Sequence, residues 1–298
     1  MKKSFVQEVP MLVEAFAKIN WSLDITGILD NGYHLMDMLM QPVSLADEVT
    51  LSPSSEISIS TSGYPPVRAD ESNIAFKAAA SLKTRTGYEG GASIHIYKRI
   101  PVGAGMGGGS ADAAAVLCGL NELWGLSLTG SDLESIGLTV GADVPFCLRG
   151  GLTRTSGIGD ILEEHPFRTG FWIVIIQPCR GLSTREVFSL WHDSGETPHP
   201  DTDRALLALE EGDLNALGQS IGNVLRPVSV RLRPQIGAAI EALKEAGAIA
   251  AEMTGSGSAV FGIFRSEKTA SSAHILLSKR WKSSFICHSQ QDSLRIHG

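Results

Sequence analysis

A glycine-rich loop is the segment whose residue types point most directly to chemistry. Between Gly103 and Gly109, five of the seven residues are glycine, and the loop follows a predicted strand and precedes a predicted helix. Without a Cβ, glycine lets backbone N–H groups approach a phosphate closely. The start of the next helix adds unpaired N–H groups, the positive end of its dipole and the hydroxyl of Ser110. We therefore expect a phosphate-binding loop rather than a plain strand-to-helix turn.

Two other kinds of nucleotide loop fit this segment less well. It lacks the Gly-Lys-Ser/Thr ending of a Walker A loop. Gly103, Gly105 and Gly108 have the spacing of a dinucleotide fingerprint, with Glu122 as its acidic partner. That fingerprint needs a strand directly after the helix, with the acid at its end. Because Glu122 falls inside the predicted helix and residues 131–140 predict another helix, an NAD(P)-dependent oxidoreductase is a weaker alternative.

The first half of the chain supplies the elements that must position this loop. Alternating apolar residues predict strands within 11–26, broken near Lys18. Turn residues follow at Asp30-Asn31-Gly32. The further predicted elements are strands at 47–51, 56–60 and 92–100, and helices at 72–86 (ended by Gly87), from near Ser110 to Gly125, and at 131–140.

The second half has a different character after Gly150-Gly151. Residues 193–202 are polar and contain proline, which predicts a loop. The order of elements is mixed rather than strictly βαβα, which indicates an α+β fold. We expect one domain over 1–160 and a second over 161–298, with a soft boundary near 155–170. The predicted elements of the second half are strands at 171–178, 248–253 and 259–264, and helices at 203–209, 213–221, 235–246 and 267–280.

Composition excludes several classes of function. The 298 residues carry a net charge of −7, which makes binding to nucleic acid or to an anionic membrane unexpected. No apolar run approaches the ~18 residues of a membrane helix, and acidic residues interrupt the N-terminus where a signal peptide would be apolar. The four cysteines lack metal or redox spacing, so we expect reduced thiols in a cytoplasmic protein and no structural zinc.

Four blocks of sequence resemble the GHMP kinase family. PVGAGMGGGSADAAA at 101–115 looks like the family's second motif, a glycine loop that wraps the phosphates of ATP. AFAKIN at 15–20, followed by DNGYH at 30–34, is similar to the first motif of a member that acts on a cytidine diphosphate-linked methylerythritol. GADVPF at 141–146 and MTGSGSAVF at 253–261 fit the same member. The blocks occur in the family's order and span nearly the whole chain.

The resemblance implies a two-domain α+β fold with the active site in the cleft between the domains. It implies transfer of the ATP γ-phosphoryl group to the 2-hydroxyl of the methylerythritol, in the non-mevalonate isoprenoid route. Magnesium is expected as the counter-ion of ATP, without a cluster of protein ligands. The partner is a small molecule, not nucleic acid or a membrane, and the protein is expected to be a monomer or a homodimer.

The resemblance also assigns the catalytic pair. Asp143 corresponds to the family's general base, and Lys18 would stabilise negative charge on the attacking oxygen. By itself, Asp143 also fits a turn aspartate before Pro145, and Lys18 fits a solvated residue at a strand end. Their joint occurrence in matching motifs favours the catalytic interpretation.

Substrate residues follow from the same matches. Cytosine is expected to stack between Tyr33 and Phe188, with His34 on the base edge. Asn20 and Thr184 would bind the sugar-phosphate or erythritol end. The alternatives in which these residues have only a structural role are an ordinary turn for Tyr33-His34 and a core position on an amphipathic helix for Phe188.

ATP residues are implied in three regions. Asn73 and Lys98 match the region around the nucleoside, although Asn73 also fits a helix N-cap. Gly255-Ser256-Gly257 would close the site beside the phosphate loop, although a hairpin turn also explains it. The loop itself contributes Pro101, Val102, Gly103, Ala104, Gly105, Met106, Gly107, Gly108, Gly109, Ser110 and Ala111.

The sequence departs from the family at three places. Phe16 replaces the usual proline or tyrosine of the first motif, and Ala111 replaces a serine of the loop, which removes one hydroxyl. Asn223-Val-Leu-Arg226 resembles an Asn-Asp-Leu-Glu stretch without its acids, and we assign it no role. The alternatives are a GHMP kinase for mevalonate, homoserine or a sugar, which a substrate panel would reveal, and a non-catalytic nucleotide-binding regulator, which ATP binding without turnover would indicate.

Overall fold

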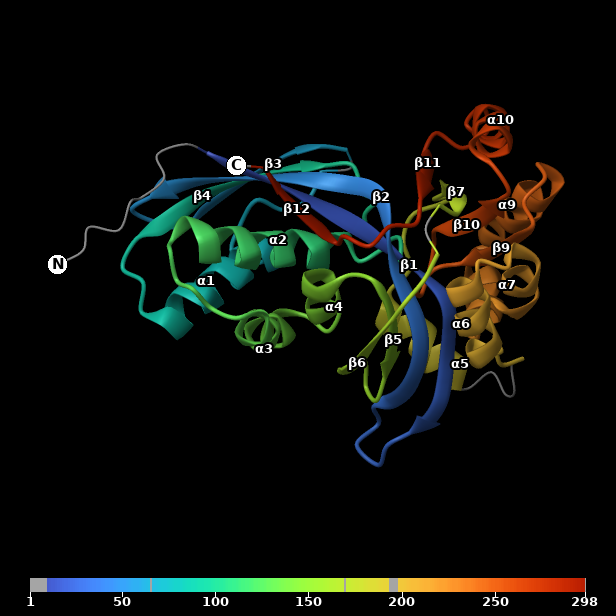
Figure 1. The fold of residues 1–298 in the computed structure, drawn as a ribbon, viewed down its shortest axis with the longest axis horizontal. Helices are drawn as coiled ribbons and strands as arrows, with labels where there is room; N and C mark the ends of the chain where they lie inside the picture. Colours follow the sequence, from blue (N-terminus) through green and yellow to red (C-terminus); the bar gives the residue numbers. More distant parts are fainter. Residues whose placement is uncertain (1–9, 65, 169, 193–197, 298) are drawn as a thin grey trace.

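The first of two sheets is organised around one long hairpin (Figure 1). The structure, a computed structural model, describes residues 10–64, 66–168, 170–192 and 198–297. β1 (Met11–Ile28) and β2 (His34–Ser54) pair antiparallel on either side of the turn at residues 29–33. The strands that extend this sheet are β4 (Gly91–Lys98), β3 (Ser58–Gly63), β5 (Leu152–Ser156), β6 (Ile161–His165), β8 (Gly222–Asn223) and β12 (Leu294–His297).

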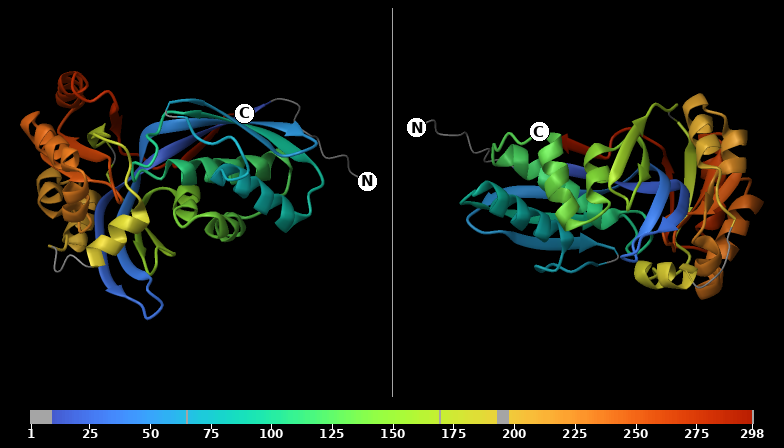
Figure 2. Two further views of the ribbon diagram at one scale, coloured as in Figure 1. Left: turned by 180° about the vertical axis from the view of Figure 1, so that it is seen from behind. Right: turned by 90° about the horizontal axis from the view of Figure 1, so that it is seen from below.

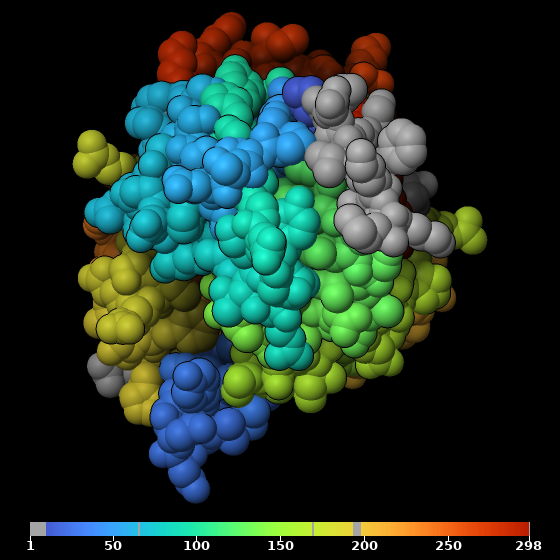
Figure 3. Space-filling view, turned by 90° about the vertical axis from the view of Figure 1, so that its left-hand side faces the viewer, coloured from blue at the N-terminus to red at the C-terminus, as the bar shows by residue number. Residues whose placement is uncertain are grey.

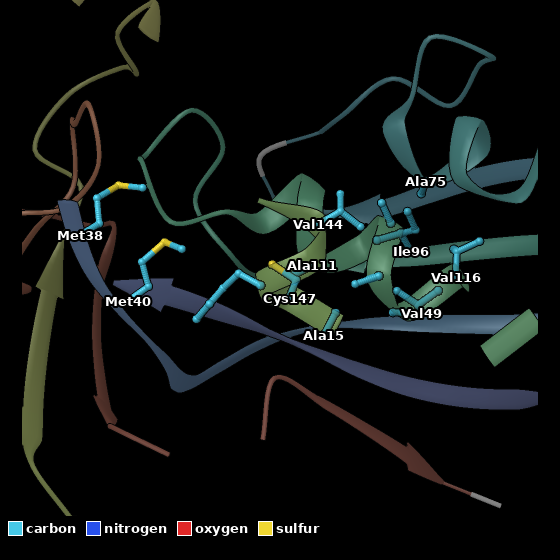
Figure 4. Close-up of a cluster of buried hydrophobic side chains, with 14 of the residues drawn as sticks. Ala15, Met38, Met40, Val49, Ala75, Ile96, Ala111, Val116, Val144 and Cys147 are labelled. Carbon is cyan, nitrogen blue, oxygen red and sulfur yellow. The ribbon is translucent and has the colours of Figure 1, made fainter. Parts of the chain in front are cut away.

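Helices cover one face of this sheet (Figure 1). They are α1 (Ile74–Thr86), α2 (Gly108–Leu123), α3 (Gly130–Val140) and α4 (Val144–Arg149). Small side chains let α2 lie close to the strands. Figure 4 shows Ala111 and Val116 of α2 among buried residues such as Val49 and Ile96 of the sheet. The glycine loop is therefore fixed at both ends by a packed core.

The second sheet is antiparallel and has the order β11-β7-β10-β9. Its central strands are buried on both faces, since every residue from Ile173 to Ile176 and from Val260 to Phe264 is buried. The strands are β7 (Trp172–Ile176), β9 (Ala250–Met253), β10 (Val260–Phe264) and β11 (Ser284–His288). The helices of this part are α5 (Thr184–His192), α6 (Thr202–Glu211), α7 (Leu214–Ser220), α8 (Arg226–Leu232), α9 (Pro234–Glu245) and α10 (Glu267–Leu277).

The α+β fold predicted from the order of elements is confirmed. One prediction about the strands was wrong: β1 is not broken near Lys18 but continues through a bulge between Phe16 and Lys18. A bulge inserts an unpaired residue without ending a strand, so the alternation shifts while the pairing goes on. The expected strand at 47–51 is the end of the much longer β2.

The chain crosses between the sheets more than once. After β11 in the second sheet, β12 returns to pair with β1 in the first sheet. The expected division near residue 160 remains a prediction. Of the expected loop at 193–202, residues 193–197 lie outside the described residues. Within the described part of the chain, no helix is long and apolar enough to cross a membrane.

Candidate active site

A cavity of about 1190 Å³ lies where the long hairpin, the glycine loop and the second part of the chain meet. Figure 3 shows a hollow between the blue hairpin tip, the yellow segment and the teal residues. Its walls include Lys18 and Tyr33 from the hairpin, Asp143 before α4, Phe188 from α5 and Ser256 from the loop after β9. Residues far apart in the sequence therefore share one site.

The glycine loop forms the floor of this cavity, which all residues from Pro101 to Ser110 line. Gly103, Gly105 and Gly107 have φ of +65°, +77° and +69°, a left-handed backbone that other residues rarely adopt. The helix begins at Gly108, two residues before the predicted start at Ser110. Gly107 occupies the N-cap position without a side-chain cap, which leaves backbone N–H groups at this end of α2 for a bound anion.

Two neighbouring segments hold this loop in place by backbone hydrogen bonds. Lys18 N–H donates to the carbonyl of Met106 at 3.0 Å, and Ala259 N–H donates to that of Ala104 at 3.1 Å. A Cβ at position 105 would lie 2.3 Å from the carbonyl oxygen of Thr254, so glycine is required there. The loop is thus clamped between β1 and the loop that precedes β10.

Lys18 and Asp143 face each other inside the cavity. The Lys18 Nζ lies 3.7 Å from Asp143 Oδ2, and the Lys18 side chain is nearly buried while that of Asp143 is 38% exposed. Asp143 stands at the N-cap position of α4, but its side chain does not cap the helix. Its carboxylate is therefore not used as a turn or cap aspartate, and it is free to face a bound molecule next to a cation.

Asn20 orients Lys18 through a buried hydrogen bond. Its Oδ1 accepts hydrogen bonds from Lys18 Nζ at 2.8 Å and from the backbone N–H of Gly255 at 3.1 Å. Asn20 is buried and does not line the cavity. The structure thus places this predicted substrate residue behind the lysine, and its contact with substrate remains a prediction.

Lys98 lies under the glycine loop in a buried ion-pair cluster. Its Nζ contacts Asp47 and lies 2.6 Å from Asp112 Oδ2, and all three side chains are nearly inaccessible. Asp47 also accepts the backbone N–H groups of Arg99 and Ile100. Burial and the neighbouring Asp47 raise the pKa of Asp112 to about 8, against the opposing effect of Lys98. The ammonium of Lys98 is therefore committed to two carboxyl groups, and its predicted contact with the nucleoside remains untested.

Aromatic side chains form one wall of the cavity. The His34 ring lies 5.1 Å from that of Phe188 and 5.9 Å from that of Trp191, both edge to face. His34 Nε2 is buried and has no hydrogen-bond partner among the described residues, and burial, together with the nearby His192, lowers the pKa of His34. Tyr33 is 59% exposed at the rim. A neutral imidazole with a free nitrogen beside exposed aromatic surface suits an aromatic heterocycle.

The remaining predicted residues occupy different places. Thr184 and Ser256 line the cavity with their hydroxyls 3.0 Å apart, and Gly255 lines it beside them. Asn73 also lines it, although its Oδ1 caps α1 by accepting from Ala75 N–H. Ala111 is buried in α2, and neither it nor Gly257 lines the cavity.

Metal ligands do not gather at this site. Within residues 10–64, 66–168, 170–192 and 198–297, no group of three or more His, Cys, Asp or Glu side chains could hold a metal ion. The side-chain oxygen donors that line the cavity at the loop are the hydroxyl of Ser110 and the carboxyl groups of Asp112 and Asp143, of which Asp112 is already bound by Lys98 and Asp143 lies beside Lys18. Such a sparse set fits a magnesium ion that arrives with its phosphates already bound.

Sequence reasoning missed two residues that shape the site. Asn223 donates from Nδ2 to the carbonyls of Met253 and Gly255, at 3.0 and 2.8 Å. Its stretch resembles a family motif, which was the available signal, but the missing acids led us to assign no role. Thr254 Oγ1 accepts a hydrogen bond from the backbone N–H of Asn20 at 3.0 Å. No local sequence pattern predicts this contact, because the two residues are far apart in the chain.

Comparison with known proteins finds two matching family domains. Residues 73–151 match the GHMP kinases N terminal domain, and residues 205–275 match the GHMP kinases C terminal domain. The chain is 42% identical over 275 residues to the 4-diphosphocytidyl-2-C-methyl-D-erythritol kinase of Alkaliphilus metalliredigens, covering 92% of this chain and 94% of the relative. It is 40% identical to the enzyme of the same name from Bacillus pumilus, covering 86% and 89%.

Solved structures give the same result for the fold. A crystal structure of 4-(cytidine 5'-diphospho)-2C-methyl-D-erythritol kinase superposes with a TM-score of 0.81 at 29% identity, covering 94% of this chain and 99% of that one. A homoserine kinase from Cytophaga hutchinsonii superposes with a TM-score of 0.77 at 19% identity, over the whole of both chains. The second likeness concerns the fold alone.

Proposed function

Because this chain belongs to the GHMP kinase family and within it to the 4-diphosphocytidyl-2-C-methyl-D-erythritol kinases, we propose that it phosphorylates that compound with ATP. The group transferred is the γ-phosphoryl group, and the acceptor is the 2-hydroxyl of the methylerythritol. The product serves the non-mevalonate isoprenoid route. The enzyme works in the cytoplasm as a monomer or a homodimer, and the free state of Cys118, Cys147, Cys179 and Cys287 supports a reducing compartment.

The observation that carries this proposal is the Lys18–Asp143 pair above the glycine loop. Phosphoryl transfer needs an in-line hydroxyl, an acceptor for its proton and positive charge near the attacking oxygen. Asp143 Oδ2 accepts the proton of the substrate hydroxyl, and Lys18 Nζ, 3.7 Å away, stabilises the oxygen as it becomes negative. Asn20 holds the side chain of Lys18 in position, and Met106 holds its backbone.

On the donor side, ATP phosphates bind the backbone N–H groups of residues 103–110 at the start of α2. Magnesium bound to the ATP phosphates would neutralise their charge, and the hydroxyl of Ser110 at the glycine loop would be the side-chain group to reach it. Asn73 borders the nucleoside region at the start of α1. Gly255 and Ser256 close the loop from the other side.

On the acceptor side, cytosine binds at the aromatic wall. Its ring stacks between Tyr33 and Phe188, and the unpartnered Nε2 of His34 hydrogen-bonds the base edge. Thr184, beside Ser256, reaches the sugar-phosphate end. The base and the reacting hydroxyl would thus occupy opposite ends of one cavity.

The test is ATP consumption with magnesium on a panel of acceptors. The panel contains 4-diphosphocytidyl-2-C-methyl-D-erythritol, mevalonate, homoserine and galactose, and mass spectrometry follows the phosphorylated product. We expect turnover on the cytidine compound alone. Turnover on another acceptor would reject the proposed substrate, and ATP binding without turnover on any of them would reject the kinase activity.

A further inference from the structure

The cations that line the cavity differ in whether a carboxylate of the protein already pairs with them. The charged side chains that line it are Lys18, Lys98, Asp112, Asp143 and Arg185. Lys18 is paired with Asp143, and Lys98 is paired with Asp47 and Asp112. Among the described residues, none places a carboxylate oxygen within 4.0 Å of the Arg185 guanidinium. Within the described part of the chain, Arg185 is therefore a cavity cation whose charge no carboxylate neutralises.

The position of Arg185 on α5 places it between two other parts of the site. Thr184, one residue before it, contacts Ser256 next to the glycine loop, and Phe188, three residues after it, contacts His34 at the aromatic wall. Residues three apart lie on one helix face, so Arg185 and Phe188 face the same side, and Ser189 also lines the cavity. Val187 is buried on the other side of the helix. Figure 2 shows the yellow helix α5 beside the blue hairpin that carries His34.

From this arrangement we infer that Arg185 binds the diphosphate of the cytidine substrate, an inference that rests on the proposed function. With the base at His34 and Phe188 and the reacting hydroxyl at Lys18 and Asp143, the diphosphate joins the two ends and passes α5. A guanidinium offers paired N–H donors that match phosphate oxygens. Arg185 thereby distinguishes a nucleoside diphosphate derivative from an uncharged nucleoside or a small alcohol.

The experiment measures the binding of cytidine and of CDP to the full-length protein by calorimetry. We expect wild-type protein to bind CDP more tightly than cytidine. Arg185→Gln should weaken CDP binding about tenfold, which is about 1.4 kcal/mol, and leave cytidine and ATP binding within about twofold, well under 1 kcal/mol. Arg185→Lys should retain part of the preference for CDP. The matched control is Arg231→Gln, an exposed arginine of α8 that does not line the cavity.

Each contrary result points to a different error. An Arg185→Gln protein that keeps the full preference for CDP over cytidine would overturn the role of Arg185. A loss of ATP affinity with CDP affinity unchanged would overturn it too, since the charge would then serve the donor nucleotide. Wild-type protein that binds neither cytidine nor CDP would overturn the proposed function itself, and this inference with it.

Discussion

Thr254 Oγ1 accepts a hydrogen bond from the backbone N–H of Asn20 at 3.0 Å, across 234 positions of sequence. Thr254 is fully buried, and its hydroxyl also lies 3.3 Å from the carbonyl oxygen of Gly105, to which it donates. Asn20 in turn accepts from Lys18 Nζ. One buried hydroxyl therefore fixes the relative positions of β1, the glycine loop and the loop after β9.

Thr254→Val should lower kcat about tenfold or more, with a smaller change in KM. Valine has nearly the shape of threonine, but it leaves the buried N–H of Asn20 unpaired, a loss of about 1–3 kcal/mol. Steady-state kinetics and thermal unfolding of the Val and Ser variants measure the two effects. Thr254→Ser keeps the hydroxyl and should recover most of kcat. A Val variant with wild-type kcat and a lowered Tm would show that Thr254 supports stability but does not position Lys18.

Gly105→Ala should abolish most ATP binding and lower Tm. An added Cβ would meet the Thr254 carbonyl oxygen at 2.3 Å, and φ of +77° disfavours any L side chain. The matched control is Gly130→Ala at the start of α3, where a Cβ meets nothing within 4 Å. That change should be neutral or stabilise by up to ~1 kcal/mol. ATP titration and thermal unfolding compare the two, and ATP affinity unchanged by Gly105→Ala would contradict the clamped loop.

Asp143→Asn should keep ATP and substrate binding but lose at least about a hundredfold in kcat, because an amide cannot accept the proton of the hydroxyl. The side chain does not cap α4, so little stability should be lost. Asp292→Asn, at an exposed carboxylate distant in sequence, is the control. Single-turnover kinetics separate chemistry from binding. Activity within about tenfold of wild type, a barrier change of ~1.4 kcal/mol, would remove Asp143 from the role of base.

Much of this architecture was predictable from local patterns. The helix predicted over 72–86 is confirmed in α1, which begins two residues later than predicted, at Ile74, and ends at the predicted Gly87, a C-cap with φ of 68°. The glycine loop was predictable because a dense run of glycines between a strand and a helix lets backbone N–H groups surround an anion, which side chains with a Cβ would prevent. The α+β class was predictable from the irregular order of strands and helices.

Long-range pairing was not predictable in the same way. β12 lies at the end of the chain yet pairs with β1 at its start, and no local pattern specifies that partner. Asn20 sits in a recognisable motif, but its position behind Lys18 depends on Thr254 and Gly255, which fold onto it from the other part of the chain. In the sequence, Lys98 is only a lysine at the end of a predicted strand. Its ion pairs with Asp47 and Asp112 form because the fold brings residues from two other elements to it.

Asp112 should make the stability of the protein depend on pH. Its pKa is about 8 in the folded protein, whereas an unfolded aspartate has about 3.9. Between these two pH values the folded protein therefore holds a proton on Asp112 that the unfolded protein has lost. The stability that this proton contributes is full at low pH and is lost as the pH rises through about 8. Lys98 and Asp47 face the same group, and Cys147 interacts electrostatically with it.

Asp112→Asn should remove this dependence. An asparagine can accept from Lys98 and donate to Asp47, which imitates the protonated carboxyl group at every pH. We expect the Tm of wild-type protein to fall from pH 6 to pH 9 more steeply than that of the variant, with the variant the more stable at the alkaline end. Asp47→Asn is the contrasting change: its amide oxygen can still accept the two backbone N–H groups that Oδ1 accepts, but its NH2 group would face the Lys98 ammonium in place of Oδ2. Parallel Tm profiles for wild type and Asp112→Asn would contradict a proton held at this carboxyl group.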